Sequence, residues 1–170
     1  MSDFVFSDET IEFILFHVKE IETAIMEKRL DSGGGKTGGN GTGHSQISDT
    51  TAIKAIRNAT ELNCVAVEFG AAINGKCDVR FIKRPETWLE VVKDTHEFYQ
   101  DRNQQIDDFL TSRYDKNDTW QETCDKLNIR KSEYYAYKAD VIHTAELYAV
   151  GYGLLSPWHR LAVNQNMGQI

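Results

Sequence analysis

Apolar residues recur at three- and four-residue steps through most of the chain, which predicts a mainly α-helical protein. The first such stretch runs from Ser7, the expected N-cap, to about residue 30. Its apolar stripe consists of Ile11, Ile14, Leu15, Val18, Ile21 and Ile25. Because a stripe of this length must be covered in a folded protein, we expect it to pack against later helices or a second subunit.

A glycine-rich stretch, residues 31–48, follows this helix. Gly35-Lys36-Thr37 matches the end of a phosphate-binding loop, but the position of the motif's earlier glycine holds Leu30. Glycine makes such a segment costly to order, so we interpret it as a flexible linker. Asp49 then caps a second predicted helix, which extends to about residue 62.

The period changes between Asn63 and Pro85, where apolar and polar residues alternate. The alternating apolar positions are Val65, Val67 and Phe69, then, beyond Asn74-Gly75, Cys77, Val79 and Phe81. Two alternating runs around an Asn-Gly pair predict a small β-hairpin. A helical reading of residues 66–73 stays open. Since a two-stranded ribbon is marginal alone, the hairpin is expected to pack on helices or to pair with another subunit.

Helical periodicity returns at Pro85, whose fixed φ and missing N–H suit the first turn of a helix. Its apolar face is formed by Trp88, Val91, Val92, Thr95, Phe98 and Tyr99. The pattern continues to about Tyr114, with a break expected near Arg102-Asn103. His96 has no triad partners nearby in sequence, so we interpret it as a surface histidine.

Residues 118–151 predict a short helix, a tight turn and a longer helix. Asp118 is the expected N-cap, with Gln121 at capping-box spacing. Asn128 is expected to end the short helix in the left-handed conformation, with Ile129 tucked behind it. The side chains expected to form the shared apolar seam are Trp120, Cys124 and Leu127, then Tyr134, Tyr137, Val141 and Ile142. This spacing is typical of a helix-turn-helix, although any helical hairpin shares it.

The fold class predicted from these patterns is mainly α, with a C-terminal helix-turn-helix and one small β-hairpin. The expected segments are a helix (1–30), the linker (31–48), a helix–hairpin–helix region (49–104), the helix-turn-helix unit (105–157) and a tail (158–170). A length of 170 residues suits one ordinary domain, or one small domain with appendages.

Composition narrows the function classes. The formal net charge of −7 means that any contact with DNA must be local, through a few basic residues on an acidic body. Cys64, Cys77 and Cys124 lack the spacing of a disulfide framework or a zinc site. The chain shows no catalytic constellation, metal-ligand set or complete phosphate loop, so we expect no enzyme and no cofactor. It also has no long apolar run and no leader, which predicts a cytosolic protein without a membrane partner.

Two stretches resemble a known family. SDTTAIKAI at residues 48–56 is similar to the start of that family's second helix, and FLTSRYDKNDTWQETCDKLNIRKSEYYAYKADVIHTAELYAVGYGLL at residues 109–155 is similar to its C-terminus. The chain thus resembles the phage-encoded regulators of the ArpU and RinA kind, small prophage proteins linked to late-gene transcription. Arg130 departs from the pattern, because such proteins usually carry Ser or Thr there.

The resemblance implies a sequence-specific DNA-binding regulator whose C-terminal part is similar to the promoter-reading domain of sigma factors. In a helix-turn-helix the second helix enters the major groove and its N-terminal residues meet the bases. The residues expected there are Arg130, Lys131, Ser132, Tyr135 and Lys138, with Lys116, Thr119 and Lys126 on the DNA backbone. The expected partners are double-stranded DNA, host RNA polymerase and, for affinity, a second copy in a homodimer.

Two other classes stay open. A small terminase-like packaging protein also pairs a helix-turn-helix with an oligomerising region, and it would form rings rather than monomers or dimers. A protein-interaction module would use the acidic surface or the hairpin edge for docking and would show no salt-dependent DNA binding.

Overall fold

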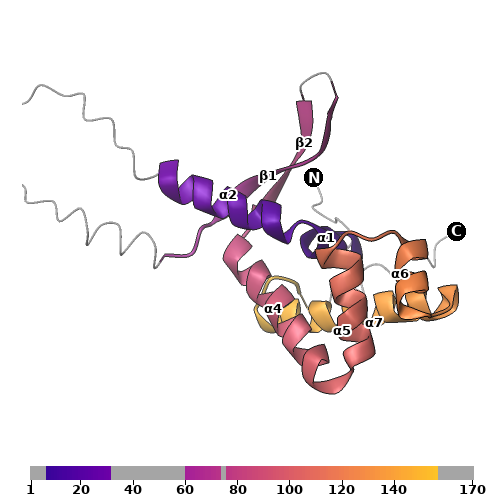
Figure 1. Ribbon diagram of the computed structural model, residues 1–170. Helices are drawn as coiled ribbons and strands as arrows, with labels where there is room; N and C mark the ends of the chain where they lie inside the picture. Colours follow the sequence, from indigo (N-terminus) through magenta and orange to yellow (C-terminus); the bar gives the residue numbers. More distant parts are fainter. Residues whose placement is uncertain (1–6, 32–59, 74–75, 157–170) are drawn as a thin grey trace, which may run out of the picture. The chain divides into compact units, whose positions relative to one another are not determined.

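The computed structural model describes residues 7–31, 60–73 and 76–156 (Figure 1). These residues fall into two compact units. The helical unit comprises described residues 7–18 and 87–156, and the ribbon unit comprises described residues 19–31, 60–73 and 76–86. The described part is mainly helical with one antiparallel hairpin, so the predicted fold class is confirmed.

The ribbon unit contains α2 (Val18–Asp31), β1 (Cys64–Ile73), β2 (Lys76–Lys83) and the first residues of α4 (Pro85–Arg102). β1 and β2 pair antiparallel, from Cys64 opposite Lys83 to Ile73 opposite Lys76. The predicted hairpin is therefore confirmed, and the helical alternative for residues 66–73 is wrong. The register shifts between Phe69 and Ile73, where Gly70 has a φ of 81°, a value that glycine adopts without strain.

The two predicted apolar runs of the hairpin face opposite ways. Val65 lies opposite Ile82, and both side chains are buried, whereas Val79 and Phe81 are exposed. The strand register explains this opposite facing, because every pair in the ladder joins an odd-numbered residue to an even-numbered one. The odd positions of β1 therefore share a face with the even positions of β2, because residues directly opposite each other project to the same side.

Polar contacts join the three parts of the ribbon unit. Lys28 of α2 donates from Nζ to the backbone oxygen of Cys64 at 2.6 Å. Glu86, at the start of α4, forms an ion pair with Arg29 and accepts a hydrogen bond from the backbone N–H of Leu62 at 2.8 Å. One carboxylate thus ties the end of α2 and the chain leading into β1 to the first turn of α4.

The helical unit contains α1 (Ser7–Phe16), α4 from Thr87 onward, α5 (Gln104–Leu110), a π-helical turn η1 (Thr111–Asp115), α6 (Trp120–Leu127) and α7 (Lys131–Gly151). Its core is centred on Phe109, whose ring meets Tyr114, Tyr134 and Tyr137 edge-on. Phe109 and Val141 are completely buried. α1 packs against α7 and η1 and covers this core.

The predicted N-terminal helix is two helices, α1 and α2, separated at His17. The apolar stripe is buried in both, but Ile14 and Leu15 belong to the helical unit and Ile21 and Ile25 to the ribbon unit. Periodicity detects a buried stripe without revealing which unit each half joins, so the single-helix prediction was wrong.

The break predicted near Arg102-Asn103 is confirmed. α4 ends at Arg102, and Asn103 caps α5 through its side chain, which accepts a hydrogen bond from the backbone N–H of Ile106. The expected linker (31–48) and the helix after it lie outside the described residues, apart from Asp31 and residues 60–62. Asn74-Gly75 and the tail (158–170) lie outside them as well.

Candidate nucleic-acid interface

α6 begins with a complete capping box. The Thr119 hydroxyl accepts a hydrogen bond from the backbone N–H of Glu122 at 3.3 Å, and the Glu122 carboxylate accepts one from the backbone N–H of Thr119 at 2.8 Å. The predicted box of Asp118 and Gln121 was thus one residue early. The Asp118 carboxylate is engaged elsewhere: it accepts from the Ser112 hydroxyl at 2.6 Å and pairs with Lys126 at 2.6 Å.

The turn between α6 and α7 is closed by Asn128, as predicted. Asn128 has left-handed angles, φ 52° and ψ 45°, and the next residue, Ile129, is buried. The backbone N–H of Ile129 donates to the carbonyl of Cys124 at 3.0 Å. This hydrogen bond spans the last turn of α6, as in a Schellman motif, and fixes where α7 starts.

α7 starts with half a capping box. Arg130 is extended at the N-cap, and its backbone N–H donates to the Glu133 carboxylate at 2.7 Å. A guanidinium has no hydrogen-bond acceptor, so Arg130 cannot supply the other half as Ser or Thr would. Its side chain is instead exposed beside the positive end of the helix.

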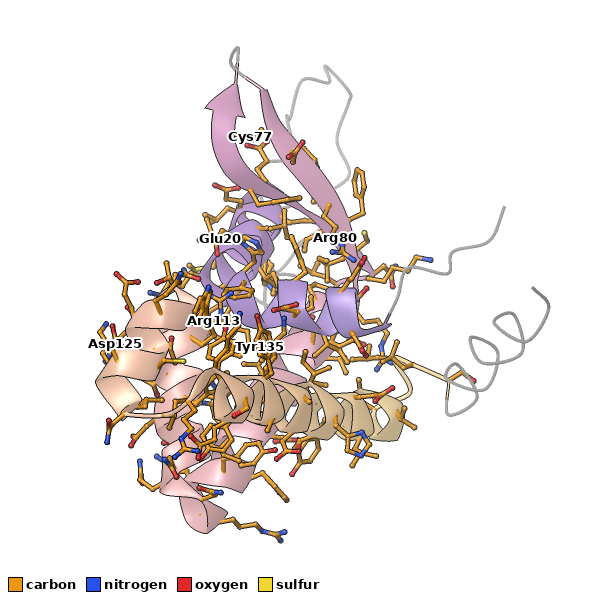
Figure 2. The ribbon with its side chains drawn as sticks, turned by 90° about the vertical axis from the view of Figure 1, so that its right-hand side faces the viewer. Glu20, Cys77, Arg80, Arg113, Asp125 and Tyr135 are labelled. Atoms are coloured by element: carbon orange, nitrogen blue, oxygen red, sulfur yellow. The ribbon has the colours of Figure 1, made fainter. Side chains whose placement is uncertain are left out.

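Three contacts hold this pair of helices against the rest of the helical unit. Arg113, in the π-helical turn, donates to the backbone oxygen of Asp118 at 2.7 Å and lies 4.4 Å over the ring of Phe16 in α1. Lys138 of α7 pairs with Glu12 of α1 at 2.6 Å. These contacts therefore fix the position of the start of α7 within the helical unit. Figure 2 shows Arg113 in the π-helical turn and Tyr135 on α7.

Four of the predicted contact residues gather at the start of α7. Arg130, Lys131, Ser132 and Tyr135 are all exposed. The ammonium of Lys131 lies 4.9 Å from the ring centre of Trp120 and 6.0 Å from that of Tyr135. These are cation–π contacts, which restrict where the lysine points.

Trp120 was missed as a surface residue. Helical spacing placed it in the seam with Cys124 and Leu127, yet its side chain is 36% exposed and meets Lys131. It is the first residue after the cap of α6, where an apolar stripe is not yet enclosed by a preceding turn. An aromatic residue at that position, followed by a basic residue in the first turn of the next helix, is the signal that could have identified it.

The other four predicted residues are placed differently. Lys126 pairs with Asp118, Lys138 pairs with Glu12, and the Thr119 hydroxyl belongs to its capping box. Lys116 is exposed beyond the π-helical turn. The structure thus concentrates the candidate surface on Arg130, Lys131, Ser132, Tyr135 and Trp120, which we call the α7 entry surface.

The charge around the α7 entry surface is nearly balanced. Between residues 116 and 138 the basic residues are Lys116, Lys126, Arg130, Lys131 and Lys138, and the acidic ones are Asp118, Glu122, Asp125 and Glu133. Lys126 and Lys138 form ion pairs, so their charges are neutralised within the protein. Asp125, labelled in Figure 2, is exposed on α6. Positive charge is therefore local to the start of α7.

His96, predicted to be a surface histidine, is partly exposed and makes contacts that the sequence did not indicate. Its imidazole lies between two carboxylates, with Nδ1 3.7 Å from Asp107 and Nε2 3.8 Å from Asp115. These contacts connect α4 to α5 and to the π-helical turn. The role they indicate is structural.

Within the described part of the chain, no group of three or more His, Cys, Asp or Glu side chains is arranged to hold a metal ion. No helix there is both long and apolar enough to cross a membrane.

The chain matches no known protein-family model, no curated protein and no solved structure. The case for a function is therefore made from the geometry of α6, the turn and α7, together with the sequence resemblance of residues 109–155.

Proposed function

We propose that this protein is a sequence-specific, DNA-binding transcriptional regulator of a phage or prophage. The observation that carries the proposal is the α7 entry surface: exposed basic, hydroxyl and aromatic side chains at the start of a helix whose position is fixed by a closed turn. A plain structural hairpin has no need to gather such side chains on its outer surface.

The chemistry follows from the major groove. α7 lies in the groove with its first turns toward the base edges. Arg130 donates two hydrogen bonds to O6 and N7 of a guanine, which is the commonest specific contact in protein–DNA complexes. Ser132 and the Tyr135 hydroxyl donate to a base or a phosphate, and Lys131 supplies a positive charge whose direction Trp120 limits.

The acidic body sets the strength of binding. Few cations face the DNA, so few counterions are released and affinity depends only moderately on salt. Each phosphate contact contributes about 0.9 to the slope of log affinity against log salt concentration. A monomer of this kind needs a second contact, from a second copy or from RNA polymerase, to reach the affinity of a working regulator.

The proposal is tested by selecting from a pool of random DNA duplexes with the intact protein. We expect a defined motif to be enriched and to bind with moderate salt dependence. Arg130→Ala with Lys131→Ala should abolish the preference for that motif. The matched control, Lys93→Ala with Arg102→Ala, removes the same two charges from α4 and should retain it.

The same experiment decides between the function classes. No retention of duplex DNA at low salt would reject the proposal in favour of a protein-interaction module. Retention without any enriched motif, together with a ring-sized mass, would instead indicate a packaging protein. A motif enriched equally by the double variant would mean that α7 is not the reading helix.

A further inference from the structure

One face of the β1–β2 ribbon is exposed although apolar side chains occupy it. The ladder places Ala66 opposite Phe81 and Glu68 opposite Val79, with Lys83 at the end of β2. All five side chains are exposed, whereas Val65 and Ile82 on the other face are buried. We call these five residues, Ala66, Glu68, Val79, Phe81 and Lys83, the outward ribbon face.

Phe81 is 73% exposed and Val79 is 51% exposed. A strand with one solvated face normally carries polar residues at these alternate positions. Neighbouring large apolar side chains on an exposed ribbon indicate a surface that is covered in use.

The outward ribbon face is complementary to itself. Along the ribbon, Lys83 comes first, then the Ala66–Phe81 pair, then Glu68 with Val79. When two such faces meet about a two-fold axis that crosses the strands, each strand lies over its own copy in the opposite direction. Phe81 then meets Phe81, and Glu68 of one copy lies over the Cys64–Lys83 pair of the other. A two-fold interface requires this kind of self-complementarity.

The outward ribbon face carries no excess of negative charge, because Glu68 is balanced by Lys83. The whole chain carries −7, but residues 64–84 contain four basic residues, Lys76, Arg80, Lys83 and Arg84, against two acidic ones, Glu68 and Asp78. Two acidic copies repel each other through their like net charge, and a face without excess negative charge reduces that repulsion. Ala66 and Glu68 also line a hollow of about 400 Å³ between α2 and β1.

We propose that the outward ribbon face is a homodimer interface, in which two copies of this chain stack their ribbons antiparallel with Phe81 at the centre. The face is small beside the roughly 800 Å² per partner of a standard interface, so the dimer is weak and forms in the micromolar range. The dimer does not depend on DNA, and it supplies two copies of α7.

The test measures the mass of the intact chain by sedimentation across a micromolar concentration series, without DNA. Wild type should pass from monomer to dimer. Phe81→Lys should weaken dimerisation about tenfold or more, as expected for a central aromatic anchor. Leu147→Lys, which changes a similarly exposed apolar residue on α7, should leave it unchanged. Circular dichroism shows that both variants are folded.

Charge reversal tests the antiparallel arrangement. Glu68→Lys and Lys83→Glu should each weaken their own dimers, because like charges then face each other. An equimolar mixture of the two variants should recover a heterodimer, since every facing pair is again of opposite charge.

A wild-type chain that stays monomeric throughout the concentration series overturns the proposal. Dimerisation that survives Phe81→Lys overturns the assignment of the face. A mixture that stays monomeric overturns the antiparallel arrangement. None of these results depends on DNA binding, so the proposed function stands or fails separately.

Discussion

Lys131 is the residue in which the structure adds most to the chemistry. Its ammonium lies near two rings, one on each helix of the pair, so part of its freedom is lost before DNA arrives. An exposed cation–π pair contributes about 0.5–1 kcal/mol. That energy limits the directions in which the ammonium can point, as the proposed reading of DNA by α7 requires.

Replacing Trp120 with Ala should therefore weaken binding to the selected duplex about two- to fivefold, the equivalent of one exposed cation–π contact. Trp120→Phe, which keeps a ring under Lys131, should lose less. Fluorescence anisotropy of labelled DNA measures both, with Leu147→Ala as the control at the far end of α7. Equal affinities for Trp120→Ala and wild type would show that the contact does not prepare Lys131 for DNA.

Asp118 makes the helical unit sensitive to acid. Hydrogen bonds from Lys126 and then from Ser112 hold the pKa of its carboxyl below the ordinary value of 3.8. A group whose pKa is lowered on folding stabilises the fold above its unfolded pKa and loses this effect as pH falls through the folded pKa. The contribution of Asp118 should thus be complete above about pH 5 and should be lost progressively below pH 3.8, as the pH falls through the lower pKa of the folded state.

Urea unfolding of wild type and Asp118→Asn as a function of pH measures this contribution. The difference between the two should be constant near neutral pH and should shrink in acid. Asp125→Asn, an exposed change on the neighbouring helix α6, should show a much smaller difference at every pH. A difference in the free energy of unfolding between wild type and Asp118→Asn that persists in acid would contradict the ionic origin of this contribution.

Tyr114 carries a hydroxyl that is buried without a hydrogen-bond partner among the described residues. Burial, and then the nearby Glu12 charge, raise the pKa of this phenol. Removing an unsatisfied buried polar group is neutral or stabilising, so Tyr114→Phe should change the free energy of unfolding by between zero and about +1 kcal/mol. Tyr99→Phe, which loses a 2.7 Å hydrogen bond to Thr144, should instead destabilise by about 1 kcal/mol. Thermal or urea unfolding compares them, and equal losses would refute the distinction.

At the scale of elements, the turn between α6 and α7 was predictable because its signals are local. Asn128 tolerates the left-handed conformation, and the apolar Ile129 closes the turn behind it. The start of α6 was predicted one residue early, because Asp118 and Thr119 are both good caps. The choice between them depends on Ser112 and Arg113 in the π-helical turn and on Lys126 in the last turn of α6.

The left-handed angles of Asn128 give a direct test of this turn. Asn128→Ala should destabilise the protein by about 1 kcal/mol, because alanine keeps the strain of a β-carbon at a φ of 52° and lacks the short polar side chain through which asparagine tolerates it. Asn128→Gly relieves that strain and should be close to wild type. Urea unfolding ranks the three proteins. Alanine and glycine variants of equal stability would show that the turn is not held in this conformation.

The ribbon and the N-terminal helix show what periodicity leaves open. Alternation identified both strands, but the facing of Val79 and Phe81 depends on register, which pairs odd with even positions. Likewise, the apolar stripe of the N-terminal segment was predicted correctly, but the division at His17 was not predicted, since it reflects two separate units. Trp120 was placed in the core for the same reason, because spacing shows which face of a helix a residue lies on but not how deeply it is buried.

At the scale of the whole molecule, an acidic chain presents a small cationic surface at the start of one helix. Of the eight residues that the sequence nominated, the structure gathers Arg130, Lys131, Ser132 and Tyr135 and engages Lys126, Lys138 and Thr119 in internal contacts. Pairing partners such as Glu12 are far away in sequence, so no local reading could have removed Lys138. We expect binding to be governed by these few exposed groups and not by the net charge.

Protection of lysines from chemical labelling tests the proposed DNA contact directly, because it locates the DNA on the wild-type protein without any substitution. Lysines are acetylated with and without the selected duplex and quantified by mass spectrometry. We expect strong protection of Lys131, whereas Lys93, exposed on α4, should be labelled equally in both samples. DNA bound by anisotropy with Lys131 labelled as in the free protein would contradict the claim that the start of α7 reads DNA.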